Sequence, residues 1–472
     1  MKRLSHRFAL LAVLLLVPVA LVIGAEQLKP QGWVFPTVKL QAVPAAPSLL
    51  QTPAGVAGDF AAAKAAPTVE FAILPGQWKD GGLWSNWGDS LCGGDGAFYC
   101  SIGEHFAPYG NALVYRVDPT SKEVKMVVDF NEVVKGPKTD YAPGKIHCPL
   151  MDGGDGWMYF IGYRGSGAGL NDEHHYMGDP MLRYEYATGK AEQVSIPAAY
   201  YSVPSSVIVT SKTKKLMYGL GGGGAVRTPN STFFVYDMAA KKTIFMGGPA
   251  PDECRSILVA PDGTAYYSTG RTAAKAAKDG QPAEPAKGGA FAKYDPKTNE
   301  VIVTDLKVPE NGTMRAASRC NADGVAYCIT HDGLVFSFDT KTEKITPITR
   351  TFEPPCPLYT AVCKLSPDDR FLYVVPGSHG GGKVAGTPVV QIDVKTGKRK
   401  VIAFLQQYMR DQTKYRCGGS FGTALSADGS QLFICFNGRD LGNPKVSWQS
   451  NEDLDFDQVA VVVLTIPESE RK

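Results

Sequence analysis

No C-x-x-C pair occurs in this sequence, although 10 cysteines are spread over its 472 residues. This absence excludes C-x-x-C-H haem attachment and zinc-knuckle sites. H-E-x-x-H is absent as well, so the chain carries no motif of that zinc-protease type. The glycine run at 221–224 lacks the strand-to-helix context and the lysine of a P-loop, which argues against a phosphate-binding loop. No motif therefore specifies a cofactor with certainty.

An excess of charge of one sign is also missing. The formal charge of +3 comes from 49 basic and 46 acidic residues, and three of the basic ones lie within residues 1–25. Without those 25 residues the chain has 46 residues of each sign and is formally neutral. A neutral chain gives no electrostatic reason to expect binding to nucleic acid, so no such partner is predicted.

Residues 1–25 have the layout of a secretory signal peptide. Lys2, Arg3 and Arg7 precede an apolar run over 8–23, and two small residues follow. We expect cleavage and an extracytoplasmic protein, either periplasmic or secreted. The alternative is an uncleaved N-terminal anchor, which would be the chain's contact with a membrane.

Residues 26–67 are rich in Ala and Pro, which predicts a linker that acts as a tether or wraps on the surface.

One strand pattern recurs along most of the remaining chain. At 256–305, two apolar stretches flank the Asp262-Gly263 turn, and two more flank a turn at 296–299. Asp-Gly accepts the positive φ that tight hairpins need, so the pattern indicates four antiparallel strands. The copies cover 92–130, 144–197, 205–247, 256–305, 315–348, 360–404 and 422–467. Seven copies of this length predict an all-β fold, a seven-bladed β-propeller of four-stranded antiparallel blades over residues 68–467.

The ends of the repeat region predict how the ring closes. The seventh copy lacks one strand, because only a short polar tail, 468–472, follows its third strand at 459–466. The segment 68–74 reads as a strand with no partner in its own repeat. We expect this N-terminal strand to become the outermost strand of the last blade, which would remove an exposed edge.

Two cysteine pairs and one insertion have open interpretations. Cys92 and Cys100 flank a GGDG turn, and Cys320 and Cys328 flank an NADG turn. Each pair is either a hairpin disulfide or two small core residues. The low-complexity segment 273–289, inside the fourth copy, predicts a surface loop.

Polar side chains that face the channel mouth of a propeller come from two kinds of segment. These are the connections that enter the first strand of each blade and the loops between second and third strands. Entry segments carry Lys145, His147, Arg255, Arg315 and Arg416. The loops carry Glu104, His105, Arg164, Asp172, Glu173, His174, His175, Arg227, Arg271, His331, His379 and Arg439. Every His beyond the signal region therefore falls on one face.

This set of residue types suits an anionic ligand. Imidazole and guanidinium groups bind carboxylate, sulfate or phosphate through charge-assisted hydrogen bonds. We expect ligand contacts from His105, Lys145, His147, Arg164, Arg255, Arg315, His331 and His379. With Glu104 or Glu173 added, the His residues could instead hold a divalent metal ion. The third interpretation is that these loop side chains are merely solvated. Trp84 and Trp87 either stack on a sugar ring or plug the channel.

The repeats resemble seven-bladed propellers of the YVTN, SMP-30 and virginiamycin-B-lyase-like type. The resemblance rests on APDGTAYY (260–267), SPDDRFLYV (366–374) and SADGSQLFI (426–434). KIH (145–147), DGWMYF (155–160) and GYRG (162–165) look like segments of uncharacterised exported planctomycete propellers. Related propellers that cleave uronates or lactone rings place metal-binding His and acidic residues at the channel, so the resemblance implies a similar site here.

Three function hypotheses follow. The leading one is an exported propeller that binds an anionic small molecule or an acidic carbohydrate at the channel mouth. The second is a metal-assisted lyase or lactonase acting on uronate-type or lactone substrates. The third is a scaffold that binds a protein partner. Whether the chain is an enzyme is left open by the sequence.

Overall fold

The computed structural model describes most of the chain. The described residues are 35–78, 82–106, 108–210, 215–223, 225, 227–228, 230–249, 254–270, 289–354, 356–443 and 455–472. The predicted signal peptide, Arg271 and nearly all of the predicted loop at 273–289 lie outside these ranges. Residues from Pro36 onward form one compact unit. No helix in the described part of the chain is long and apolar enough to cross a membrane.

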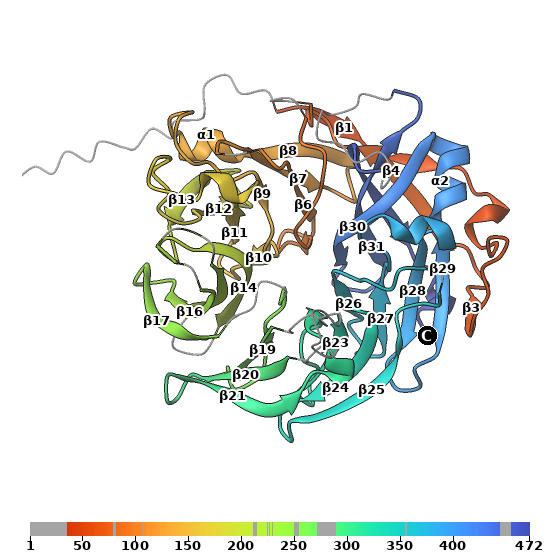
Figure 1. Cartoon of the computed structure of the whole chain (residues 1–472). Coiled ribbons are helices and arrows are strands. Elements are labelled where there is room, and N and C mark those ends of the chain that lie inside the picture. Colours follow the sequence, from red (N-terminus) through yellow and green to blue (C-terminus); the bar gives the residue numbers. More distant parts are fainter. Residues whose placement is uncertain are drawn as a thin grey trace, which may run out of the picture. The chain divides into compact units, whose positions relative to one another are not determined.

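Seven sheets form this unit, each built around antiparallel strands that mostly follow one another in the chain, and they are the predicted blades of a β-propeller (Figure 1). Blade 1 contains β5 (Leu91–Cys92), β6 (Phe98–Gly103), β7 (Ala112–Val117) and β8 (Glu123–Asp129). Blade 2 contains β9 (Lys145–Ile146), β10 (Met151–Asp152), β11 (Trp157–Tyr163), β12 (Met181–Glu185) and β13 (Ala191–Ser195). Blade 3 contains β14 (Ser202–Thr210), β15 (Lys215–Gly222), β16 (Thr232–Asp237) and β17 (Lys242–Pro249). Blade 4 contains β18 (Leu258–Val259), β19 (Ala265–Ser268), β20 (Ala290–Asp295) and β21 (Glu300–Lys307).

The remaining blades continue the same order. Blade 5 contains β22 (Met314–Ala317), β23 (Val325–Thr330), β24 (Leu334–Asp339) and β25 (Lys344–Arg350). Blade 6 contains β26 (Cys363–Leu365), β27 (Phe371–Val374), β28 (Pro388–Asp393) and β29 (Arg399–Phe404). Blade 7 contains β30 (Tyr415–Leu425), β31 (Gln431–Asp440), β32 (Gln458–Thr465) and β4 (Thr68–Ile73). The helices are α1 (Phe130–Val134) and α2 (Leu405–Thr413), with short 3-10 turns η1 (Pro47–Leu49), η3 (Gly167–Gly169), η4 (Pro309–Asn311), η5 (Gly381–Ala385) and η6 (Glu468–Glu470).

The turns between strands are where the sequence predicted them in blade 4. Gly263 has φ of +90°, and its amide donates to the carbonyl of Ala260 in the turn between β18 and β19. Asn299, at the end of the predicted turn between β20 and β21, has φ of 60°. Glycine and asparagine tolerate this left-handed region, so these two residues fix the register of both hairpins.

Ring closure by the N-terminal strand is confirmed. Strand β4 pairs antiparallel with β32, and Phe71 lies opposite Val462. The expectation that β4 is the outermost strand is wrong, because β2 (Gln41–Val43) pairs with its outer edge. The predicted four-stranded blades are confirmed, and blades 1, 6 and 7 each gain one strand from the N-terminal segment. Strand β1 (Thr37–Lys39) is added to blade 1, β2 to blade 7, and β3 (Phe60–Ala62) joins β29 of blade 6 in parallel.

The segment at 26–67, predicted as a linker, thus supplies three strands in its described part. These strands cover the outer edges of blades 1, 6 and 7, which lie next to one another around the ring. Covering an edge satisfies backbone donors and acceptors that would otherwise remain open to another chain. In blade 2, the fifth strand has another origin, because the innermost strand is interrupted at 147–150 and counts as β9 and β10.

The core lies between neighbouring blades, where large rings pack face to face. Phe98 of blade 1 and Phe433 of blade 7 stack with centroids 5.3 Å apart, which joins the first and last blades. Phe233 of blade 3 and Tyr267 of blade 4 stack at 5.1 Å and an interplanar angle of 3°. All four residues are fully buried. Such buried rings supply much of the apolar area that holds radially arranged sheets together.

The cysteines form no disulfide bond. All ten, including the two pairs beside the GGDG and NADG turns, are free thiols. Cys92 lies opposite Phe98 in the β5–β6 ladder, so Cys100 is two residues past the position that faces it. The hairpin-bridge interpretation is therefore wrong, and Cys100 and Cys328 are the small buried core residues of the alternative interpretation.

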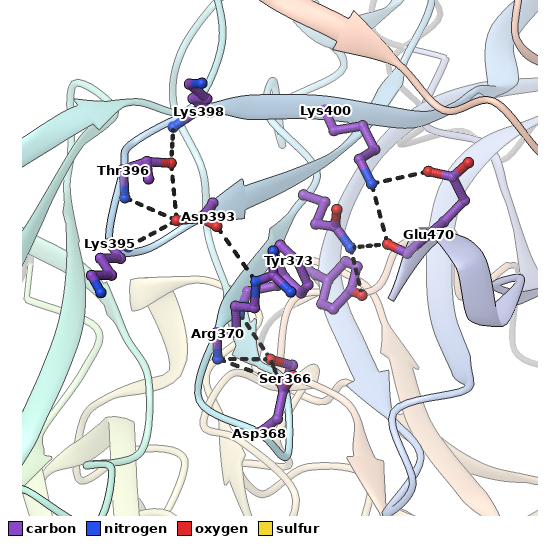
Figure 2. Close-up of polar contacts among 12 residues, drawn as sticks. Ser366, Asp368, Arg370, Tyr373, Asp393, Lys395, Thr396, Lys398, Lys400 and Glu470 are labelled. Carbon is purple, nitrogen blue, oxygen red and sulfur yellow. Dashed lines mark hydrogen bonds and ion pairs between the residues drawn. The ribbon is translucent and has the colours of Figure 1, made fainter. Parts of the chain in front are cut away.

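The C-terminal residues 468–472, expected as a polar tail, are anchored to blade 6 (Figure 2). Glu470 in η6 is 4% exposed, and its carboxylate accepts hydrogen bonds from Lys400 Nζ at 2.9 Å and from the amides of Lys64 and Ala65 at 2.7 and 2.9 Å. The Glu470 carbonyl accepts from Gln391 Nε2 at 2.9 Å. One carboxylate thus connects the C-terminus, the outer strand β29 and the chain after β3.

Candidate functional site

Two cavities lie along the inner strands and define the candidate site. The mouth cavity, of about 340 Å³, is lined by Trp87, Lys145, His147, Arg255, Arg315, His331, Tyr359, His379 and Phe421. The inner cavity, of about 520 Å³, is lined by residues that include Asp89, Asp152, Ser205, Ser318, Arg319 and Lys364. Trp87, His147, Arg255, Arg315 and Phe421 line both and therefore form the boundary between them.

The mouth cavity brings together six of the eight residues predicted to contact a ligand. Lys145 lies in β9 and Arg315 in β22, while Arg255 precedes β18. His331 and His379 follow the second strands of blades 5 and 6. These positions are the entry segments and second-to-third loops from which the sequence argument selected them.

The other two predicted residues do not line the mouth cavity. His105 contacts two residues that do: His105 Nε2 is 2.8 Å from Lys145 Nζ, and the His105 ring stacks on Trp87 at 4.7 Å. Arg164 donates to the carbonyl of Gly223 at 3.2 Å and lies over the ring of Tyr163. Neither Gly223 nor Tyr163 is a lining residue, so Arg164 is one step further from the cavity than His105.

The remaining polar residues on the predicted face form separate local contacts. His175 is paired with Asp140 at 3.0 Å, and its side chain is 72% exposed. Arg227 pairs with Asp172 at 3.0 Å. Glu104 is buried and accepts from the amide of Asn111 at 2.8 Å. The further residues of this kind, which line neither cavity, are Glu173, His174, Arg416 and Arg439.

Arg255 and Arg315 carry charge without a paired carboxylate. Arg255 Nε and Nη1 and Arg315 Nε are buried and have no hydrogen-bond partner among the described residues. Among the described residues, no Asp or Glu lines the mouth cavity. The backbone of both arginines is fixed by the preceding blade, because Ser205 Oγ donates to the Arg255 carbonyl at 2.8 Å and Ser256 Oγ donates to the Arg315 carbonyl at 3.2 Å.

Burial makes the charge on Arg315 costly. This residue is 6% exposed, and burial, together with the nearby Arg255, lowers the pKa of its guanidinium to about 10. The guanidinium lies over the ring of Tyr359, 4.9 Å from the centroid. A cation over an aromatic face recovers part of the lost hydration energy. An anion in the mouth cavity would recover much more, because buried charges are ordinarily paired.

Lys145 is the third cationic residue of the mouth cavity. Lys145 is 7% exposed, and its Nζ lies 4.7 Å from the centroid of the Trp87 ring. Burial lowers the pKa of Lys145 to about 7, with Arg255 and Arg164 acting in the same direction and Glu104 against it. Gly103 of β6 permits this placement, since a Cβ there would lie 2.7 Å from Lys145 Cβ.

The imidazoles of His105 and His147 are neutral at pH 7. Burial lowers the pKa of His105 to about 3, and the positive charge of Lys145 adds to the effect. Burial also holds the pKa of His147 well below its usual range, with Arg255 and Lys145 contributing. Positive charge beside the cavity therefore comes from the arginines and Lys145, while His105 and His147 act as neutral hydrogen-bonding groups.

Two aromatic residues of the cavity were missed by the sequence argument. Tyr359 stacks flat against His379 at 4.6 Å and 4°, and Phe421 lies 5.2 Å from the Trp87 ring. Both come from segments entering their blades, the same position that supplies Arg255 and Arg315. Aromatic residues are common in the strands of this chain, so residue type alone does not single these two out. Trp87 lines the cavity, whereas Trp84 is buried in a cluster with Phe421 and Phe456.

Two chemistries that the sequence raises are not assembled here. No group of three or more His, Cys, Asp or Glu that could hold a metal ion occurs within the described ranges, so the metal-assisted lyase hypothesis lacks a ligand set there. Residues 418–422 read GGSFG, which matches the letters of the G-x-S-x-G nucleophile motif. Ser420 lies inside the long strand β30 and not at a strand-to-helix turn, so the match is accidental.

Comparison with known proteins identifies the fold alone. No protein-family model matches the chain. No curated protein matches it either. Among solved structures, U3-55K is similar with a TM-score of 0.50 and 9% identity, covering 84% of this chain and 98% of its own. The WD40 repeats of RRP9 are similar with a TM-score of 0.50 and 10% identity, covering 84% and 97%. The chain therefore belongs to the structural class of seven-bladed propellers, and its function must be argued from the cavity.

Proposed function

We propose that the protein binds an anionic small molecule, of which an acidic carbohydrate is the leading candidate, in the mouth cavity. The observation that carries this proposal is the pair Arg255 and Arg315. Arg255 Nε and Nη1 and Arg315 Nε are buried beside the cavity and lack acceptors among the described residues. Unsatisfied buried donors destabilise a protein unless a ligand supplies the acceptor.

The composition of the cavity favours a carboxylate on a ring-shaped body. Arg255 and Arg315 offer planar donors that match a carboxylate, and Trp87, Tyr359 and Phe421 offer aromatic faces. A volume of about 340 Å³ lies within the range of small-ligand pockets. In the inner cavity, Lys364 is paired with Asp89 at 2.5 Å, so its charge is already compensated. The anion is therefore expected at the mouth.

Calorimetric titration of the full chain tests this proposal. The ligands are glucuronate, its neutral parent glucose, and sulfate. Glucuronate should bind and glucose should not. Charged hydrogen bonds contribute about 1.5–3 kcal/mol each, so Arg255→Met/Arg315→Met should weaken glucuronate binding about 100-fold or more.

The matched control removes the same charge away from the cavity. Arg183 pairs with Glu192, and Arg350 pairs with Glu310 at 2.7 Å. Arg183→Met/Arg350→Met should leave the affinity unchanged. Equal losses in both double variants would attribute binding to net charge alone and would contradict the proposed site.

The protein-scaffold hypothesis has one observation in its favour. Exposed apolar side chains occur on the outer strands of two adjacent blades, with Ile244 and Met246 on β17 and Ile302 and Val303 on β21. Cross-linking of a captured partner should map to these two strands. Cross-links confined to other blades would argue against this surface.

Export is proposed on the sequence of residues 1–25 alone. Expression of the full chain with a C-terminal tag should give a mature N-terminus close to residue 26 in the extracytoplasmic fraction. A full-length chain recovered from the cytoplasm would contradict export and leave the cavity argument unaffected.

A further inference from the structure

Lys145 differs from the channel's other lysine in having no carboxylate partner. Its Nζ lines the mouth cavity together with Arg255 and Arg315. The polar contact that the structure gives this nitrogen is the 2.8 Å approach to His105 Nε2. Lys364, in the inner cavity, is instead ion-paired with Asp89. Of the two described lysines that line the cavities, Lys145 is thus the one whose nitrogen is not held in an ion pair with a carboxylate.

The surroundings of Lys145 favour the neutral amine. Arg255 and Arg164 repel its positive charge, and burial against Trp87 and Tyr163 removes water from it. Glu104 opposes this effect, but its carboxylate is engaged by the backbone amides of Phe106 and Asn111. A desolvated lysine beside other cationic groups is the arrangement that makes an amine nucleophilic near neutral pH.

The geometry points to covalent chemistry: we propose that Lys145 forms a Schiff base with an oxo acid whose carboxylate is held by Arg255 and Arg315. This inference rests on the proposed anion site and specifies its ligand. The class is a carboxylate that also carries an aldehyde or ketone, which includes the open-chain form of a uronate. The two arginines fix the acid group, and the carbonyl carbon then faces the amine that shares their cavity.

The reaction balances without a redox partner. The Lys145 nitrogen adds to the carbonyl carbon, and one amine proton passes to the carbonyl oxygen, giving a carbinolamine. His105 Nε2, 2.8 Å from Nζ, holds the amine in place, and the second amine proton passes to the departing oxygen. The carbon–oxygen bond then breaks, the oxygen leaves as one molecule of water, and a carbon–nitrogen double bond remains. No electrons are gained or lost.

Reductive trapping tests the inference on the full chain. The protein is incubated with glyoxylate or glucuronate in the presence of cyanoborohydride, which reduces the imine to a stable secondary amine. Peptide mass spectrometry should find one modified site, Lys145, with Lys364 unmodified as the internal control. Lys145→Arg should abolish trapping, because a guanidinium keeps its charge and does not form the imine.

The outcomes separate this inference from the proposed function. Glucuronate binding by calorimetry without any Lys145 adduct overturns the Schiff base and leaves the anion site intact. Absence of both binding and adduct overturns the two together. Modification of exposed lysines at the same rate as Lys145 also overturns the inference, since it would show ordinary amine reactivity. Lys145→Gln, with its fold verified by urea unfolding, serves if Lys145→Arg does not fold.

Discussion

Replacing Arg315 by methionine should stabilise the protein while removing its ligand affinity. Arg315 is 6% exposed as a residue and burial lowers the pKa of its guanidinium from 12.5 to about 10, so the charged form costs about 3 kcal/mol at this position. Methionine fills a similar volume without charge. It forfeits the contact of the cation with Tyr359, which contributes about 0.5–2 kcal/mol. The net expectation is a gain of about 1–3 kcal/mol in the free energy of unfolding.

Urea unfolding measures this effect, with the transition midpoint rising and its slope unchanged. Arg399→Met is the matched control, because the Arg399 side chain is 7% exposed and paired with Glu353. Its removal leaves a partly buried carboxylate without its partner and should destabilise by about 1–3 kcal/mol. The two substitutions of buried arginines are therefore predicted to change the free energy of unfolding in opposite directions.

Adding glucuronate should stabilise the wild-type chain but not the Arg315→Met variant. Glucuronate at 100 times its dissociation constant should stabilise the wild-type chain by about 2.7 kcal/mol and the Arg315→Met variant hardly at all. A loss of more than about 1 kcal/mol in ligand-free Arg315→Met would refute the reasoning, since it would mean that the guanidinium is already compensated inside the protein.

Three further predictions concern the same cavity and the C-terminus. Anion affinity should weaken up to about tenfold as the pH rises through 7, because Lys145, with a pKa of about 7 beside Arg255, Arg164, Glu104 and His105, loses its charge, and calorimetry on Lys145→Arg should show no such decline. Tyr359→Ala should lower the affinity about 3- to 30-fold by removing the ring under Arg315, whereas Tyr359→Phe should retain most of it; equal losses would refute a role for the ring. Glu470→Gln should cost about 1–3 kcal/mol in urea unfolding at pH 7. Hydrogen bonds lower the pKa of Glu470, so its contribution is present above the ordinary pKa of a glutamate and is lost as the pH falls below it; a difference that persists at low pH would contradict this assignment.

The blades and the ring closure could be predicted because their signals are local. Asp262-Gly263 and the turn ending at Asn299 specify hairpins within a few residues, and seven repetitions of one pattern leave few other architectures. The unpaired strand at 68–74 could be assigned for the same reason, since one copy lacked a strand. The strands β1, β2 and β3 could not, because each has three residues, mostly exposed, in an Ala- and Pro-rich context.

For the site, the sequence predicted where most of the side chains lie but not their protonation states or hydrogen-bond partners. The entry and loop positions of a blade place Lys145, His147, Arg255, Arg315, His331 and His379 around one cavity. Whether an imidazole there is charged depends on its burial and on neighbours from other blades, as with Arg255 and Lys145 beside His147. The lack of an acceptor for Arg255 Nε and Nη1 and for Arg315 Nε among the described residues is likewise a property of the assembled ring. Aromatic residues such as Tyr359 carry no distinguishing signal in a strand-rich sequence.

A crystal structure of the full chain with glucuronate tests the central claim most directly. We predict a carboxylate about 2.7–2.9 Å from nitrogens of both Arg255 and Arg315, with the sugar ring against Trp87 or Tyr359. A glucuronate that binds in calorimetry but lies elsewhere on the protein, with both guanidiniums still unpaired, would contradict the account.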